Sequence, residues 1–130
     1  MWAVTFPLTG VWSSENTGLY YSSFEDVTLA LAADGTGWVA FSRPGYSDSA
    51  LLTWRASGDG TLELSYREGR EVSGGRAAAS DFSREPTRVA YRITEEDTPF
   101  RGRAAILRID PPIMLHNEFG LKQETIPGRP

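Results

Sequence analysis

The sequence predicts an all-β domain, built as an eight-stranded antiparallel up-and-down β-barrel. Apolar and polar residues alternate over most of the chain, as in strands with one buried face, whereas the spacing typical of amphipathic helices is nearly absent. Turn signals such as Asp-Gly, Gly-Asp-Gly and Asp-Pro-Pro separate the short apolar runs. Because most links between these runs are short, consecutive strands are expected to pair as hairpins.

Composition excludes several classes of protein. The 130 residues suit one domain, residues 1–130, with a single core. The net charge is −4 and the basic residues are scattered among acidic ones, so we expect no nucleic-acid partner. No apolar run is long enough to span a bilayer, and the N-terminal residues do not resemble a secretory signal, so no membrane partner is expected. The absence of cysteine suits a cytoplasmic protein, and the arginine-rich basic composition is typical of a GC-rich bacterial genome.

The alternation of apolar and polar residues predicts eight strands. They are expected over residues 9–14, 26–32, 37–43, 50–57, 61–68, 87–95, 103–110 and 113–122.

The hairpin over residues 26–43 turns at Asp34-Gly35. A two-residue turn there suits the type I′ preference for positive φ, and it would pair Leu31 with Trp38. One face of the hairpin then holds most of the larger apolar side chains and is predicted to point inward. This inward face comprises Val27, Leu29, Leu31, Trp38 and Ala40, with Ser42 at its end.

The next hairpin turns at Gly58-Asp59-Gly60. A three-residue loop, with Gly60 in the left-handed conformation, separates apolar from polar side chains better than a two-residue turn. The inward face of this register comprises Leu52, Trp54, Ala56, Leu62, Leu64 and Tyr66. The opposite face is polar, as expected for a sheet with one face in water.

The last three strands alternate in the same way. Their predicted inward residues are Val89, Tyr91, Ile93, Ala105, Leu107, Ile109, Ile113, Leu115, Phe119 and Leu121, with Asn117 in the same line. Eight sequential antiparallel strands can close into a barrel or form a two-sheet β-sandwich. Short hairpin links favour the barrel, and closure also removes the exposed strand edges that invite aggregation.

The first predicted strand carries a Gly-x-Trp motif, Gly10-Val11-Trp12. With eight meandering strands and this length, the chain resembles the lipocalin-like barrels of the calycin superfamily, and most closely the bacterial lipocalin-like domains of unassigned function. The resemblance implies that Trp12 closes one end of the barrel as a structural plug, with Lys122 as the best-placed basic partner. The second lipocalin motif and the usual disulfide are absent, and the link before residue 26 is too short for the helical lid of fatty-acid-binding proteins.

No motif points to catalysis, a metal or a cofactor. The sequence has no nucleophile elbow, phosphate loop or dinucleotide fingerprint, and no cysteine. The only histidine, His116, alternates with Met114 and Glu118 and is expected on the wet face rather than as a ligand or base. Acidic residues at Glu25-Asp26 and 95–97 are adjacent in sequence rather than opposed across a cleft, so they are expected to be solvated. We therefore predict no catalytic residue, no metal site and no cofactor.

A binding site is predicted from polar and aromatic residues in the inward lines. Buried hydroxyl and amide groups need partners, and in an apolar pocket they orient a ligand. The predicted ligand-binding residues are Trp38, Ser42, Trp54, Tyr66, Tyr91 and Asn117, and the predicted lid residues are Tyr20, Tyr21 and Phe24. Alternatively, the aromatic side chains fill the barrel and leave no cavity.

The expected function is non-enzymatic binding of a small hydrophobic or amphipathic ligand. The first alternative is a protein-interaction module with a filled core that acts through its loops. The long link over residues 69–86 is rich in Gly, Ser and Ala and is expected to be mobile. A small barrel enzyme that uses Tyr and Asn as proton donors is the least favoured alternative, and the sequence leaves the oligomeric state open.

Overall fold

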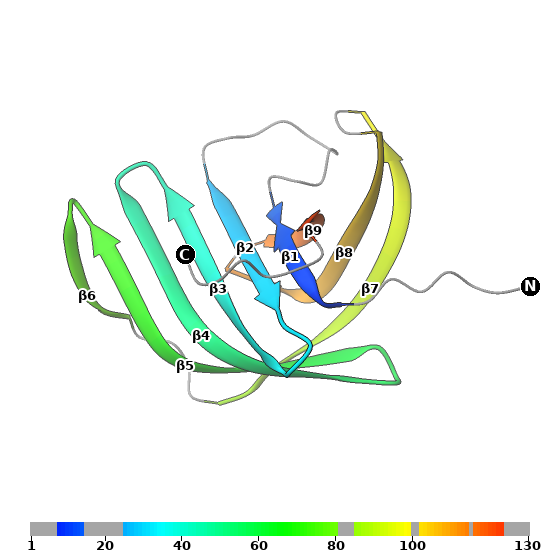
Figure 1. Ribbon diagram of the computed structural model, residues 1–130, viewed down its shortest axis with the longest axis horizontal. Coiled ribbons are helices and arrows are strands. Elements are labelled where there is room, and N and C mark those ends of the chain that lie inside the picture. Colours follow the sequence, from blue (N-terminus) through cyan, green and yellow to red (C-terminus); the bar gives the residue numbers. More distant parts are fainter. Residues whose placement is uncertain (1–7, 15–24, 81–84, 100–101, 115, 124–130) are drawn as a thin grey trace, which may run out of the picture.

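Nine strands make up most of the protein in a computed structural model, which describes residues 8–14, 25–80, 85–99, 102–114 and 116–123. The strands are β1 (Gly10–Ser13), β2 (Asp26–Leu31), β3 (Thr36–Arg43), β4 (Tyr46–Ser57), β5 (Thr61–Ser73), β6 (Arg76–Ser80), β7 (Thr87–Thr98), β8 (Gly102–Ile113) and β9 (His116–Gln123) (Figure 1). The all-β prediction is confirmed for this part of the chain. The described residues contain no helix that is long and apolar enough to cross a membrane.

The strands form one antiparallel sheet that closes in a ring. Its order is β4-β3-β2-β1-β9-β8-β7-β5-β6, and an additional pairing of β4 with β5 closes the ring and leaves β6 outside it. The described strands therefore form a single sheet rather than the two sheets of the sandwich alternative. Among these strands β6 pairs with β5 alone, which makes nine strands where eight were expected.

The ring is joined unevenly around its circumference. The pairing of β5 with β7 is confined to Thr61–Leu64 and Thr87–Ala90, whereas β7 and β8 pair from Ala90 to Thr98. In Figure 1 the hairpins of β3 to β6 and the hairpin of β7 and β8 rise on opposite sides of the molecule, with β1, β2 and β9 between them. The two sides meet at the bottom of this view, where β5 and β7 pair.

The hydrophobic core lies on the inner face of this ring. Its fully buried members include Trp12, Leu29, Val39, Leu64 and Phe119. These residues come from β1, β2, β3, β5 and β9, so one core is shared by strands from both halves of the chain. Such a shared core is what the period-two alternation predicts for strands with one apolar face.

The predicted register of β2 and β3 is wrong by one residue. Leu31 pairs with Gly37 rather than Trp38, and Leu29 pairs with Val39. The turn is a three-residue loop, in which Gly35 has a φ of 86° and its N–H donates to the Ala32 carbonyl over 3.1 Å. One extra residue in the turn exchanges the two faces of β3, because successive side chains alternate. Consequently Val39 and Phe41 face the core, and Trp38, Ala40 and Ser42 lie on the outer face.

The predicted register of β4 and β5 is confirmed. Leu52 pairs with Tyr66, Trp54 with Leu64 and Ala56 with Leu62. Gly60 has a φ of 85°, as the three-residue loop requires.

The link over residues 69–86 differs from the expected mobile loop. Gly69–Ser73 continue β5, and β6 pairs with them across a turn at Gly74-Gly75, so residues 69–73 and 76–80 are paired backbone. Both turn glycines have positive φ, 57° and 83°, which side chains disfavour and glycine tolerates.

Candidate functional site

A cluster of aromatic and charged side chains lies on the inner face of β3, β4 and β5, next to the close-packed hydrophobic core. Val39 and Ala50 pair across β3 and β4, and both are buried in the core. Two residues further along each strand, alternation brings Phe41 and Asp48 to the same face, where they also pair. Across the next pair of strands, Asp48 is the partner of Glu71. Three strands therefore place an aromatic ring and two carboxylates side by side.

Tyr46 connects the members of this inner cluster, which we define as Phe41, Arg43, Tyr46, Asp48 and Glu71. Its ring lies edge-to-face with Phe41, with centroids 6.0 Å apart and an interplanar angle of 68°. The Arg43 guanidinium lies over the same ring, 4.9 Å from its centroid, in a cation–π contact. The Tyr46 hydroxyl donates to Glu71 Oε2 over 3.0 Å, and this hydrogen bond raises the pKa of Tyr46.

Asp48 differs from the other members because one of its oxygens has no partner among the described residues. This oxygen, Oδ1, is buried and accepts no hydrogen bond from them. Burying a carboxylate oxygen without a donor is costly, since the oxygen loses its bonds to water and gains nothing in exchange. Such an atom in a folded protein calls for an explanation, and a bound group is one of them.

Three of the predicted ligand-binding residues lie on the same inner surface. Trp54, Tyr66 and Tyr91 are partly buried and pack against the core. Trp54 donates its indole N–H to the Ala32 carbonyl over 3.0 Å, so this polar group is satisfied within the protein. Burial raises the pKa of Tyr66, whose hydroxyl also hydrogen-bonds with Thr87. Each of these rings packs against the core on one side and keeps part of its surface exposed.

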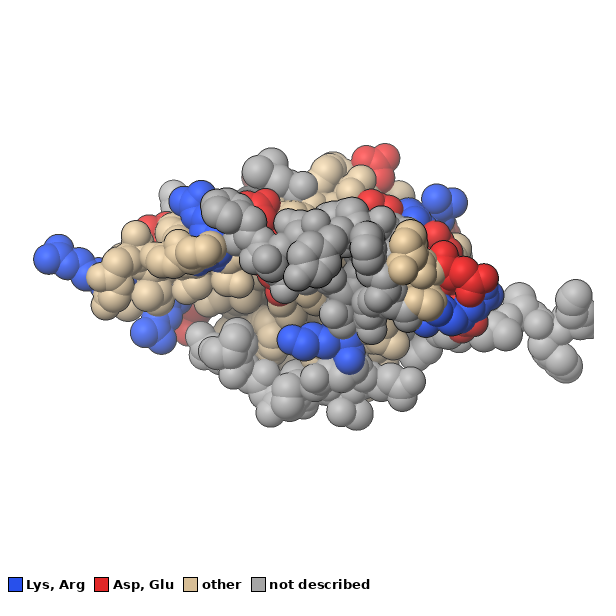
Figure 2. All heavy atoms as spheres, turned by 90° about the horizontal axis from the view of Figure 1, so that it is seen from above, with Lys and Arg blue, Asp and Glu red and all other residues tan. Residues whose placement is uncertain are grey.

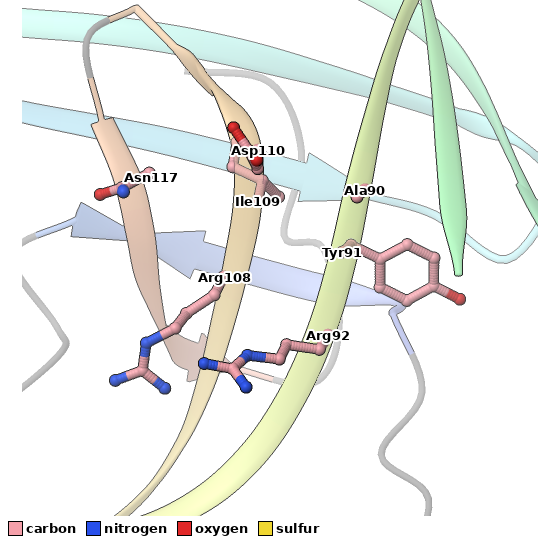
Figure 3. Close-up of a pocket in the computed structure, with 7 residues that line it drawn as sticks. All are labelled: Ala90, Tyr91, Arg92, Arg108, Ile109, Asp110 and Asn117. Atoms are coloured by element: carbon pink, nitrogen blue, oxygen red, sulfur yellow. The ribbon is translucent and has the colours of Figure 1, made fainter. Parts of the chain in front are cut away.

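The other three predicted ligand-binding residues lie elsewhere. The register of β3 places Trp38 and Ser42 on the outer face, which removes them from any interior site. Asn117 is exposed, and with Tyr91 it lines a hollow of about 300 Å³ between β7, β8 and β9. Figure 3 shows that Tyr91 points away from Arg92 and Arg108, which line the same hollow. Tyr91 thus reaches the core side of the sheet, while the two arginines occupy its outer side.

Arg108 is held by two carboxylates beside this hollow. It forms ion pairs with Glu96 and with Glu118, the latter over 3.1 Å, and its side chain is 24% exposed. Two hydrogen bonds lower the pKa of Glu96 to about 2, the one from Arg108 with the larger effect and the one from Thr94 with the smaller. The charges here are matched within the protein, so this network is best explained as a tie between β7, β8 and β9.

Charges are also matched at the far end of β7 and β8. Arg103 lies 2.7 Å from Glu95 and 3.3 Å from Asp97. Figure 2 shows acidic and basic side chains next to one another over this end of the molecule. Exposed pairs of this kind contribute little to stability, and they give the surface no single sign that would attract a charged polymer.

Trp12 is completely buried and donates its indole N–H to the Leu8 carbonyl over 2.8 Å. Gly10, two residues before it, has a φ of 135°, a conformation that favours glycine. Lys122 is exposed and follows Leu121, the residue that pairs with Trp12. The register shifts here, because Val11 pairs with Gln123 and Trp12 with Leu121, so Lys122 is the extra residue of a β-bulge. Its role as the basic partner of Trp12 stays a prediction. The expected lid residues Tyr20, Tyr21 and Phe24 lie outside the described residues.

His116 is half-buried and bonds to one carboxylate. Its Nε2 lies 3.0 Å from Glu25 Oε1, which joins the start of β9 to the start of β2. The described residues contain no group of three or more His, Cys, Asp or Glu side chains that could hold a metal ion. In this environment His116 has the role of a polar contact between two strands.

Sequence reasoning missed Tyr46, Asp48 and Glu71, because the predicted strands began at residue 50 and ended at residue 68. A signal existed in β4, where Tyr46 and Asp48 continue the even-numbered line of Ala50 and Leu52. Comparison of the chain with protein-family models, curated proteins and solved structures found no match.

Proposed function

We propose that this protein binds a small amphipathic molecule on the inner face of its ring, without catalysis. The observation that carries the proposal is the composition of that face. Fully buried aliphatic residues give way to rings that are only partly buried, Phe41, Trp54, Tyr66 and Tyr91. Next to one of these rings, Phe41, lie the charged and hydroxyl groups of the inner cluster. An apolar wall with a few convergent polar groups is the usual composition of a small-molecule site.

We further propose that the ring is a lipocalin-like barrel. In support, the first described strand carries the Gly-x-Trp motif, and the eight described strands other than β6 can be followed around the ring in chain order through their pairings. The strand β6 is then an addition to β5 outside that circuit. This proposal explains why β5 leaves β7 after only a short pairing, since β6 takes the place of β7 along the rest of β5.

Native mass spectrometry of the purified protein, before and after extraction with organic solvent, tests the binding proposal. We expect a mass difference that corresponds to a released small molecule, and rebinding of amphiphiles that changes the fluorescence of Trp54. Trp54→Phe should remove that fluorescence change, whereas Trp38→Phe, on the outer face, should leave it. Absence of both a released molecule and any amphiphile-induced change would refute the proposal.

A second candidate function is docking of another protein at β6. This strand lies at an edge of the sheet, and its middle residues Ala77, Ala78 and Ala79 are exposed. Natural edge strands usually carry charges, prolines or bulges that prevent pairing with another chain, and these three residues carry none. The register of β6 on β5 directs the N–H groups of Ala77 and Ala79 toward the free edge, so Ala79→Pro removes one N–H from that edge. A partner captured by the wild-type protein and lost with Ala79→Pro would favour this function over ligand binding.

A further inference from the structure

Asp48 has an acceptor atom that none of the described residues uses. Its Oδ1 is buried without a hydrogen bond, and no ion pair reaches Asp48 from the residues that the structure describes. The side chain lies between Phe41 on β3 and Glu71 on β5, its direct partners on the two neighbouring strands. A bound group that satisfies this oxygen has to supply a donor at this point of the inner face.

Neither Arg43 nor Tyr46, the two donor side chains of the inner cluster, forms an ion pair or a hydrogen bond with Asp48 among the described residues. The Arg43 guanidinium lies over the Tyr46 ring, 4.9 Å from the centroid, and so neutralises neither carboxylate through an ion pair. The Tyr46 hydroxyl donates its only proton to Glu71 over 3.0 Å. Glu71 is thereby provided with a donor, and Asp48 is the carboxylate of the pair that is left without one.

The surroundings of Asp48 also fit a specific kind of donor. A carboxylate binds a charged N–H group about twice as strongly as a neutral one, because the hydrogen bond is charge-assisted. The ring of Phe41, which meets Tyr46 edge-to-face, can attract a cation through its π face and provides an apolar wall. Phe41 itself packs against the core, so an apolar chain that starts at Asp48 can continue along buried aliphatic side chains.

We propose that Asp48 anchors a protonated amine, and that the ligand of this protein is an amphipathic primary amine. The ammonium group donates to Asp48 Oδ1, and the apolar portion lies against Phe41 and the partly buried rings of the core. This inference rests on the proposed binding function and specifies the chemistry of its ligand. A carboxylate ligand is disfavoured at this position, because its charge would face two carboxylates.

Matched eight-carbon compounds test the inference by isothermal titration calorimetry at pH 7. We expect octylamine to bind at least about tenfold more tightly than octanol, because the charge-assisted bond replaces a neutral one. Octyltrimethylammonium, which keeps the charge but has no N–H, should bind between the two, and octanoate should bind most weakly. Asp48→Asn should bring octylamine to the affinity of octanol. Asp59→Asn, at the exposed turn between β4 and β5, is the matched control and should change neither.

The outcomes separate this inference from the function on which it rests. Equal binding of octylamine and octanol by the wild-type protein would overturn the role of Asp48 and leave ligand binding intact. Failure of all four compounds to bind would overturn both. The wild-type comparison does not depend on any variant, so it decides the matter even if Asp48→Asn does not fold. In the ligand-free state Asp48→Asn should melt at the same or a higher temperature, since it removes the charge from a half-buried side chain whose Oδ1 has no donor among the described residues.

Discussion

Trp12 is the largest side chain of the core and has no solvent exposure, so its removal measures how much the ring depends on its interior. An aromatic side chain of this kind buries about 150–250 Å². At about 25 cal/mol per Å² this area corresponds to roughly 4–6 kcal/mol, which is an upper bound because the unfolded chain also buries some surface. The hydrogen bond to the Leu8 carbonyl contributes about 1 kcal/mol more.

We therefore expect Trp12→Ala to lower the free energy of unfolding by about 4 kcal/mol, within the range of about 3–5 kcal/mol for such deletions. For a chain of 130 residues this loss corresponds to a fall in Tm of about 15 °C. Trp12→Phe keeps a ring but loses the hydrogen bond, so a loss of about 1–2 kcal/mol is expected. Urea unfolding followed by circular dichroism measures all three proteins.

The matched control is Trp38→Ala, which removes the same side chain from the outer face of β3. Trp38 is half-buried, and its loss should cost no more than about 2 kcal/mol. Equal losses for the two alanine variants would refute the placement of these tryptophans on opposite faces of the sheet. Such a result would instead favour the register in which Trp38 pairs with Leu31 and faces the core.

Two further predictions concern single positions in the sheet. Gly37→Ala would place a Cβ 2.1 Å from the Ala30 carbonyl oxygen, so we expect a loss of at least about 2 kcal/mol in urea unfolding, whereas Gly58→Ala meets no atom within 4 Å and should be neutral. Arg108→Gln should cost about 1 kcal/mol at pH 7, because it breaks the ion pairs to Glu96 and Glu118. The pKa of Glu96 is lowered to about 2, so its contribution is complete above its ordinary pKa of 4.5 and is lost as the pH falls through about 2. The stability difference between wild type and Arg108→Gln should shrink over that interval, and a difference that persists at pH 2 would contradict the role given to this pair.

The two Asp-Gly-Thr turns show how far the sequence predicts the fold. At both turns the aspartate Oδ1 accepts a hydrogen bond from the N–H of the threonine two residues later, over 3.0 Å at Asp34 and 3.1 Å at Asp59. Both glycines adopt positive φ, and both loops have three residues. The second register was predicted because Leu62 and Leu64 separate clearly from polar neighbours. The register of β2 and β3 was missed because both faces of these strands carry apolar side chains, so the alternation does not favour one register over the other.

Each of these turns also contacts the strand that follows in the ring. The carbonyl of Gly35 accepts a hydrogen bond from the backbone N–H of Trp54, over 2.9 Å. The carbonyl of Gly60 accepts one from the backbone N–H of Tyr91, also over 2.9 Å. The common local sequence therefore produces a common long-range contact. Treating the two turns as equivalent would have given the correct register for both hairpins and placed Trp38 outside.

The candidate site was less predictable because it depends on a change of phase within β5. Leu52 pairs with Tyr66, but Ala50 pairs with Gly69, so β5 has one more residue than β4 between these two pairs. Even-numbered residues face the core before this bulge, and odd-numbered residues share the face of Ala50 after it. Counting alternation from Leu64 would direct Arg70 inward and Glu71 outward. The pairing with β4 decides otherwise, and it is this bulge that brings Glu71 beside Asp48. A bulge that re-aims one carboxylate toward another is unfavourable for folding alone, which is why we look for its reason in a cationic group bound between the strands.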